Sequence, residues 1–356
     1  MPPDLQVGVI IPTHNRKEIL KRVLDSVFNQ TCAKDTYEVI VVDDGSSDGT
    51  EEYTRANCSP GEVRFVFLRQ ENKGPAAARN LAVKASLGEL VLILNDDVIP
   101  ERGLIEAHVR AHARIGPRNG VLGHVIPATE LRQTPLLRYI ESAESRAKLQ
   151  DGQKLSHRHF ITNNLSLRRD ILFEAGLFDE RFRYPIGEDI DLGYRLERLG
   201  FQLYFRKDAI GYHYHPFDFE SYCRRMRMHG RNAIYYSMVA NPAYELGLHG
   251  AVYDQFQPLS VLLRGRGVPK RLARWTVGKA FFNQPTMTSV HTAVLSLERQ
   301  MPFILVSTLY RVLFSYEYYV GMKEGLHILS KDKRVSQAHV LLSEAVGNGD
   351  LDEDRD

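Results

Sequence analysis

Residues 89–97 read ELVLILNDD, in which an apolar run is followed at once by Asn95, Asp96 and Asp97. A short unbroken apolar run is typical of a strand that is buried on both faces of a parallel sheet. Two adjacent carboxylates after such a strand would repel each other if they were buried without partners. They are tolerated if a divalent cation lies between them and an anionic ligand, and Mg²⁺ and Mn²⁺ suit this arrangement. The plainer alternative is a solvated turn that ends at Pro100.

Earlier strands end in the same way. The run VGVIIP at residues 7–12 leads into Thr13-His14-Asn15, and Glu38 to Val42 leads into Asp43-Asp44. Helical patterns follow each strand, and strands alternating with helices predict right-handed βαβ units, a parallel sheet and an α/β fold. Ligands bind beyond the carboxyl ends of the strands of such a sheet, so we expect the three polar clusters to meet at one crevice.

The first strand-to-helix turn excludes two classes of nucleotide-binding protein. It reads Pro12-Thr13-His14-Asn15-Arg16 and contains no glycine, whereas a dinucleotide fold or a P-loop needs glycines there. Asn15 and Glu18, three residues apart, instead resemble a capping box at the start of the first helix. Asp43-Asp44 could contact a base or a ribose, although the following Gly45-Ser46-Ser47-Asp48-Gly49 also has ample turn chemistry.

Composition narrows the function classes further. Of 356 residues, 43% are hydrophobic and 25% are charged, which is ordinary for a globular protein. The net charge of +2 argues against a dedicated nucleic-acid-binding protein. Three cysteines without CxxC spacing argue against a disulfide framework or a zinc knuckle and fit a reducing compartment, and the N-terminus does not resemble a signal peptide.

The longest apolar stretch, Pro302 to Tyr316, contains one charged residue. It is shorter than the roughly 20 residues of a spanning helix. Phe303, Val306, Leu309, Leu313 and Tyr316 recur at helical spacing, which predicts a buried amphipathic helix. The alternative is a helix that lies on a membrane surface.

Several blocks together resemble glycosyltransferase family 2, whose fold is called GT-A. They occur in family order over about residues 6 to 215: VGVIIPTHNR, VIVVDDGSSDGT, NKGPAAARN, LNDDVIP, TNNLSLRR, GLFDERF, GEDIDLGYRLERLGF and YHYH. The resemblance implies an α/β fold with a mostly parallel, Rossmann-like sheet flanked by helices and followed by a mainly helical C-terminal region. It also implies an inverting enzyme that takes a sugar from a UDP, GDP or dTDP donor with the help of Mn²⁺ or Mg²⁺. The acceptor would be a hydroxyl group of a glycan, a lipid-linked molecule or another compound.

The motif blocks and, beyond them, the residue pattern together predict an organisation of the chain. Residues 1–220 would form the catalytic domain, with a nucleotide-binding half over 1–100 and an acceptor half over 101–220. Residues 221–345 would form the helical region, which could mediate a homo-oligomer, and the acidic tail 346–356 would be disordered. We expect a cytoplasmic protein with a peripheral contact at the inner face of the membrane, made by the basic segment Arg264 to Lys279 and the stripe from Phe303.

The resemblance assigns roles residue by residue. It assigns nucleotide-sugar binding to Pro12, Thr13, His14, Asn15, Asp44, Arg79, Asn95 and Asp96. Asp97 would be the direct metal ligand, joined by His213, although a packed aromatic strand is the plainer alternative for His213 and His215. Asn95 stands where the family usually has aspartate, so its role as a charged ligand is in doubt. His157 and His159 would belong to an acceptor loop or be merely exposed.

The catalytic base would be Asp189, with Glu188 beside it. Inversion needs one carboxylate to take the proton of the acceptor hydroxyl, and a cation neutralises the leaving diphosphate. Asp189 lies at a predicted helix start, where the helix dipole would keep it ionised. Asp191 is the rival base, and it is grouped with Asn163 and Asn164 as a candidate acceptor contact.

Two other functions remain open at this point. A nucleotidyltransferase can use a related fold, but it would need a glycine-rich loop after the first strand. A non-catalytic sugar-nucleotide-binding or scaffold protein is favoured only by Asn95, whereas Asp97 and Glu188-Asp189 argue against it. Assaying donor hydrolysis with and without metal distinguishes these alternatives.

Overall fold

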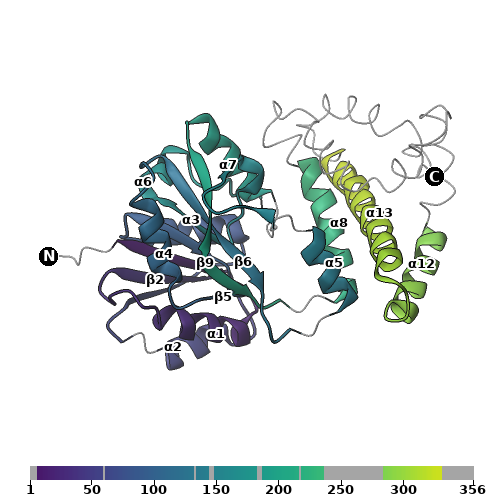
Figure 1. Cartoon of the computed structure of the whole chain (residues 1–356), viewed down its shortest axis with the longest axis horizontal. Helices are drawn as coiled ribbons and strands as arrows, with labels where there is room; N and C mark the ends of the chain where they lie inside the picture. Colours follow the sequence, from purple (N-terminus) through teal and green to yellow (C-terminus); the bar gives the residue numbers. More distant parts are fainter. Residues whose placement is uncertain are drawn as a thin grey trace. The chain divides into compact units, whose positions relative to one another are not determined.

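The computed structural model describes residues 6–58, 61–131, 134–143, 148–182, 187–215, 218–235 and 284–330. Contacts divide the chain into two compact units. The first is Met1–Arg132 with Glu141–Pro216, and the second is Gln133–Ile140 with Phe217–Asp356. The first unit contains the sheet, and the described part of the second is helical (Figure 1).

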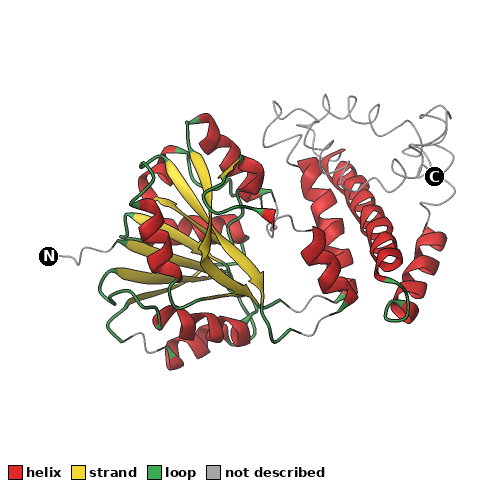
Figure 2. Ribbon diagram, viewed as in Figure 1, coloured by secondary structure: helices red, strands yellow, loops and turns green. Residues whose placement is uncertain are grey.

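The described part of the first unit is built on one sheet of nine strands, in the order β3-β2-β1-β4-β8-β6-β9-β5, with β7 also pairing with β9 (Figure 2). The strands are β1 (Val7–Thr13), β2 (Tyr37–Asp43), β3 (Arg64–Arg69), β4 (Leu90–Leu94), β5 (Val98–Pro100), β6 (Asn119–Pro127), β7 (Lys154–Leu155), β8 (Asn164–Arg168) and β9 (Gln202–His213).

Strands β3, β2, β1 and β4 are parallel, as the alternating pattern predicts. Thr13 of β1 is paired with Asp43 of β2, so the polar residues that follow these strands begin at the same level of the sheet. Strand β4 is in register beside β1, with Val9 opposite Leu92. The carboxyl ends of the first four strands therefore form one edge, and the three polar clusters converge there.

The other half of the sheet is mixed. Strand β8 is antiparallel to both β4 and β6, and β5 and β7 are antiparallel to β9, whereas β6 and β9 are parallel. The expectation of a mostly parallel sheet therefore holds only for the first half. The antiparallel direction has a consequence for the site: the start of β8, at Asn164, lies opposite Leu94 at the end of β4.

Helices cover both faces of the sheet. Those of the first unit are α1 (Lys17–Phe28), α2 (Thr50–Asn57), α3 (Pro75–Ala85), α4 (Leu104–His112), the short 3₁₀ helix η2 (His157–His159), α6 (Arg169–Glu174) and α7 (Glu188–Arg198). Alternate residues of β1 enter two separate cores: Val9 and Ile11 pack on the α1 side, and Ile10 packs with the small residues of α3. Alanines on α3 bring that helix close to the sheet, because they present almost no side chain.

The predicted capping box at the start of α1 is wrong. Residue Asn15 adopts a left-handed conformation with φ of 52°, and Arg16 takes the N-cap position without a side-chain bond. The carboxylate of Asp48, from the loop after β2, accepts a hydrogen bond from the backbone N–H of Lys17 at 3.0 Å. A side chain from another loop thus satisfies this end of the helix, which leaves the Asn15 side chain available for other contacts.

The second unit consists, in its described part, of α5 (Pro135–Ala143, of which residues up to Ile140 are included), α8 (Phe219–Tyr235), α12 (Gln284–Leu297) and α13 (Phe303–Ser330). The apolar stripe of α13 faces the core of this unit: Val306 and Leu313 are buried, and Phe303, Leu309 and Tyr316 pack against them. The structure thus supports the buried amphipathic helix over a membrane-surface stripe.

Helices α8 and α13 approach each other closely. Any Cβ added at Gly230 would collide with the carbonyl oxygen of Tyr318, and one added at Gly321 would collide with that of Arg227. Both glycines are needed for this helix contact. None of the helices that the structure describes is both long and apolar enough to cross a membrane. The segments Arg264 to Lys279 and 346–356 lie outside the described residues.

Candidate functional site

Two carboxylates follow β4 at the edge where the strands converge. Both are buried, and they make different contacts. Asp96 accepts a hydrogen bond from the hydroxyl of Thr13 at 2.8 Å and one from the guanidinium of Arg16 at 3.3 Å. The same Arg16 nitrogen also donates a short hydrogen bond to Asp97 Oδ2. A cation from the first strand-to-helix turn thus lies against both carboxylates and offsets their mutual repulsion.

Two histidines at the end of β9 complete this cluster. His215 donates through Nδ1 to Asp97 Oδ2 at 3.1 Å, and His213 Nε2 lies 3.5 Å from the same oxygen. The rings stack with their centroids 5.6 Å apart. Backbone pairing produces the arrangement, because Tyr214, between the histidines, donates its N–H to the carbonyl oxygen of Asp97 at 2.7 Å. Ligand atoms of Asp97, His213 and His215 all lie within 4.8 Å of one another.

This cluster fits a divalent cation. Asp97 Oδ1 is buried and has no hydrogen-bond partner among the described residues. An unpaired buried carboxylate oxygen is costly unless something binds it. One carboxylate and two imidazoles also form a donor set that Mn²⁺ and other first-row metals accept.

The two carboxylates differ in proton affinity. Burial disfavours the charged form of Asp97, but hydrogen bonds from His213 and His215, together with the charge of Arg16, outweigh it and hold its pKa well below the usual range. Burial raises the pKa of Asp96 to about 6, and the charge of Arg16 only partly offsets this. Asp97 is therefore the better metal ligand of the two, because it stays ionised.

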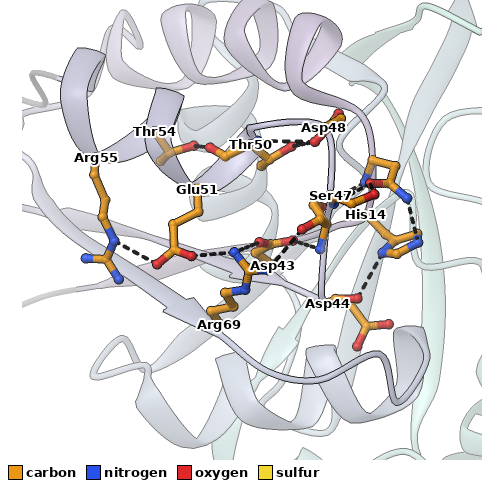
Figure 3. Close-up of polar contacts among 12 residues, drawn as sticks. His14, Asp43, Asp44, Ser47, Asp48, Thr50, Glu51, Thr54, Arg55 and Arg69 are labelled. Carbon is orange, nitrogen blue, oxygen red and sulfur yellow. Dashed lines mark hydrogen bonds and ion pairs between the residues drawn. The ribbon is translucent and has the colours of Figure 1, made fainter.

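The other end of the site is built by the loop after β2. Asp44 is buried and accepts three hydrogen bonds from the segment that leads into α3: Gln70 Nε2 at 2.7 Å, Lys73 N at 2.8 Å and Gly74 N at 2.9 Å. Its backbone carbonyl oxygen contacts His14 Nδ1 at 2.9 Å (Figure 3). Asp44 thus joins the loop after β2 to the segment before α3, and it is also a candidate contact for a nucleobase.

Asn15 fixes the same loop from the first turn. Its Oδ1 accepts the backbone N–H of Ser47 at 2.8 Å, and its own N–H donates to Ser46 Oγ at 2.8 Å. Its Nδ2 lies 3.0 Å from His14 Nε2. Both His14 and Asn15 are exposed, whereas Pro12 at the end of β1 is half-buried. An open hollow of about 510 Å³ lies beside this loop, lined by Gly45, Arg69, Gln70, Glu71 and Asn72.

The third part of the site lies at the start of α7. Gly187 precedes this helix with φ of 104°, a conformation that favours glycine. The guanidinium of Arg79, on α3, forms an ion pair with Glu188 at 2.7 Å, and both side chains are almost completely buried. Arg79, which the resemblance assigns to nucleotide binding, thus contacts Glu188 in this structure.

Asp189 follows Glu188 and is half-buried. Burial, followed by the nearby charge of Glu188, raises its pKa to about 7, and the charge of Arg79 only partly offsets the rise. The start of the helix therefore does not hold the pKa of Asp189 low, because desolvation is the larger effect. A carboxylate with this pKa can both take up and release a proton near neutral pH.

The three candidate acceptor residues lie in different environments. Asp191 is buried and pairs with Arg195 at 2.8 Å, and that arginine also donates to the carbonyl oxygens of Ala175 and Leu177. Asn164 is fully buried and bonds His108 Nε2 at 2.8 Å. Both side chains are thus committed to internal contacts.

Asn163 and Asn95 lie side by side at the edge of the sheet. Each is half-buried, and their backbones approach through an N–H to carbonyl contact of 3.5 Å. The structure therefore brings Asn163, but not Asn164, to the edge that carries Asp96 and Asp97. His157 lies elsewhere, paired with Glu197 at 2.5 Å.

Two residues of the site were missed or undervalued from sequence. The sequence assigns no role to Arg16, although two buried carboxylates require a nearby cation. It assigns His213 but not His215 to the metal, although residues two apart in an extended chain point to the same side. That spacing was the available signal for His215.

Comparisons with known proteins agree with this geometry. The family model described as glycosyl transferase family 2 matches residues 8–176, and the one described as glycosyl transferase family group 2 matches residues 138–322. The chain belongs to glycosyltransferase family 2.

Two curated relatives are similar over more than half of the chain. Glycosyltransferase AglE of Haloferax volcanii is 32% identical over 208 residues, which cover 58% of this chain and 66% of that protein. Validoxylamine A glucosyltransferase of Streptomyces hygroscopicus subsp. limoneus is 29% identical over 231 residues, which cover 58% of this chain and 51% of that protein. The chain thus matches between about half and two thirds of the length of these relatives.

A solved structure shares the fold. It is the mannosyltransferase PcManGT from Pyrobaculum calidifontis in complex with GDP-Man and Mn²⁺, with a TM-score of 0.57 and 21% identity. The match covers 90% of this chain and 88% of that one. The fold is accordingly of the GT-A type, with a helical C-terminal region.

Proposed function

We propose that the protein is an inverting glycosyltransferase that moves a sugar from a nucleoside-diphosphate donor to an acceptor hydroxyl. The observation that carries the proposal is the convergence, at one edge of the sheet, of the Asp97–His213–His215 cluster with the loop that Asp44 and His14 build. Membership of glycosyltransferase family 2 supports this activity, and so does the nucleotide-sugar complex of the mannosyltransferase that shares the fold.

Asp97, His213 and His215 would hold a divalent cation. Mn²⁺ or Mg²⁺, when bound, offsets the negative charge that develops on the leaving nucleoside diphosphate. Asp96 is held by Thr13 and Arg16, so we assign it to a contact with the ribose or with water rather than to direct ligation. Arg16, which already lies between the two carboxylates, is a candidate to bind a donor phosphate from the same position.

The first turn and the loop after β2 would hold the nucleoside. His14 and Asn15 are exposed and fixed by the loop, so they present a preformed polar surface. The Asp44 carboxylate accepts three hydrogen bonds from its neighbours. It can accept about one more, for example from an N–H of the nucleobase. We propose that the nucleobase of the donor lies against Asp44 and in the hollow beside it.

Asp189 would act as the base. In an inverting transfer the acceptor oxygen attacks the anomeric carbon from the face opposite the diphosphate, while one carboxylate removes its proton. Asp189 suits this step because its pKa of about 7 makes it a stronger base than an ordinary aspartate while leaving much of it ionised at neutral pH. The rival Asp191 is tied to Arg195. Glu188 and Asn163 remain candidates for contacts with the sugar or the acceptor.

A donor screen tests the proposal. Release of nucleoside diphosphate from UDP-glucose, UDP-N-acetylglucosamine, GDP-mannose and dTDP-glucose is measured with Mn²⁺, with Mg²⁺ and with chelator. We expect metal-dependent release from at least one donor. We also expect the Asp189→Asn enzyme to lose about 10² to 10⁴-fold in kcat while donor binding stays near wild type.

Four results would contradict parts of this assignment. Donor binding without turnover would favour the non-catalytic alternative. Activity that chelator leaves unchanged would remove the metal. Retained anomeric configuration in the product, or near-normal kcat in the Asp189→Asn enzyme, would exclude Asp189 as the base of an inverting reaction.

A further inference from the structure

Two neighbouring residues of α3 hold the region around the proposed base. Arg79 pairs with Glu188 at 2.7 Å, and Asn80 binds the backbone of Phe178 with both ends of its amide: Nδ2 donates to the carbonyl oxygen and Oδ1 accepts the N–H, each at 2.9 Å. Both α3 side chains are buried. Helix α3 is thus joined to the start of α7 through Arg79, and to the segment that follows α6 through Asn80.

The ion pair is shielded from water. The side chains of Arg79 and Glu188 are 6% and 3% exposed, and the guanidinium carbon lies 5.5 Å from the ring centre of Phe178. A buried charge without its partner costs several kcal/mol, so each residue depends strongly on the other. Glu188 is the charged partner of the Arg79 guanidinium in this buried site.

We propose that Arg79 is a positioning residue for the base, and that it holds Glu188 and offsets its negative charge beside Asp189. The inference rests on the proposed function, in which Asp189 takes the acceptor proton. The family resemblance assigns Arg79 to a contact with the nucleotide of the donor. The role proposed here is instead beside the residue that takes the proton of the acceptor.

The charges around Asp189 come from two elements. Glu188, on the same helix, disfavours ionisation of Asp189, and Arg79, from α3, favours it. Of the charged groups that act on Asp189, Glu188 and Arg79 have the largest effects. Changing the charge of residue 79 must therefore change the pH at which Asp189 becomes a base, whereas a purely structural residue would change only the amount of folded enzyme.

The test compares variants in which residue 188 no longer titrates. The acid limb of the kcat–pH profile is measured between pH 5 and 9, at saturating Mn²⁺, with the donor that gives turnover in the screen. We expect Glu188→Gln to move the limb to lower pH by about one unit, because it removes the negative neighbour and leaves the positive one. Adding Arg79→Gln should move the limb back up by about one unit.

Adding Arg79→Lys to Glu188→Gln is the matched control. It keeps the charge, so the limb should stay with the Glu188→Gln enzyme. Folding is checked by circular dichroism, and the double Gln variant removes both charges together, so no unpaired charge is left buried. If the double Gln variant does not fold, the acid limb of wild type is compared with that of the Glu188→Gln enzyme instead. An acid limb at the same pH in both enzymes would overturn the proposal.

Other outcomes separate this inference from the proposed function. If the limb is the same with Gln and with Arg at residue 79, the inference fails. If instead the donor KM rises tenfold or more and the limb stays in place, Arg79 is a nucleotide ligand and the inference also fails. If the Asp189→Asn enzyme keeps near-normal kcat, or if wild type has no acid limb, the proposed base itself is wrong.

Discussion

Replacing Asp189 by asparagine should stabilise the fold while removing activity. The pKa of Asp189 rises from 3.8 to about 7 because burial and the charge of Glu188 disfavour its ionised form. At 1.36 kcal/mol for each pKa unit, this rise corresponds to about 4 kcal/mol. We expect about half of it, or ~2 kcal/mol, because the residue keeps part of its contact with water.

The sign follows from proton binding. Between pH 4 and pH 7 the folded state binds more protons at this residue than the unfolded state does, so the free energy of unfolding contributed by Asp189 falls as pH rises. Asparagine does not titrate. The variant should therefore be as stable as wild type near pH 4. Its free energy of unfolding should exceed that of wild type by a margin that grows as pH rises and is complete above about pH 7.

The assay is urea unfolding followed by circular dichroism at pH 4.5, 6, 7 and 8, for wild type and Asp189→Asn. Asp35→Asn serves as the control for loss of one aspartate charge, since Asp35 is exposed. A difference in unfolding free energy that stays flat across this range, or an Asp189→Asn protein less stable than wild type at pH 8, would refute the reasoning. Such a result would mean that the carboxylate is solvated or has a compensating partner.

Three further predictions concern other parts of the molecule. Asp97→Asn should weaken Mn²⁺ binding about 100-fold or more, because both His213 and His215 contact a carboxylate oxygen of Asp97. Asp96→Asn should weaken Mn²⁺ binding clearly less. Mn²⁺ titration followed by electron paramagnetic resonance measures both affinities, and the reverse order would contradict the assignment. Gly321→Ala should destabilise the second unit by about 1–3 kcal/mol, because the new Cβ meets the α8 backbone; an unchanged urea midpoint would contradict the close helix contact. Asn15→Ala should lower the free energy of unfolding by about 1 kcal/mol or more, because alanine tolerates a positive φ poorly and cannot accept the hydrogen bond from Ser47. The melting temperature measures the loss. Asn15→Gly should recover part of it, because glycine adopts a positive φ without strain.

Much of the first half of the fold was predictable from sequence. The apolar runs that end at Pro12, Val42 and Leu94 are strands, and each is followed by polar residues at one edge of the sheet. This works because parallel strands buried on both faces need unbroken apolar runs, and because their carboxyl ends must coincide.

Contacts between distant segments were decided by the tertiary structure alone. Asp97 meets His215 across 118 residues, because β5, which begins at Val98, pairs with β9. Arg79 meets Glu188 across 109 residues, because α3 lies against the start of α7. No local periodicity records which strands become neighbours. The antiparallel direction of β8 and the recruitment of Gln133–Ile140 into the second unit belong to the same class.

The sequence by itself thus determined the elements, the edge of the sheet where the polar residues gather, and the family. The tertiary structure decided which of those residues touch. Asp44 and Arg79, which the sequence assigned to a nucleotide, are engaged by Gln70, Lys73, Gly74 and Glu188. The proton affinity of Asp189 was largely a tertiary property, because desolvation has the largest effect on it and Arg79, from another helix, partly offsets the charge of the adjacent Glu188.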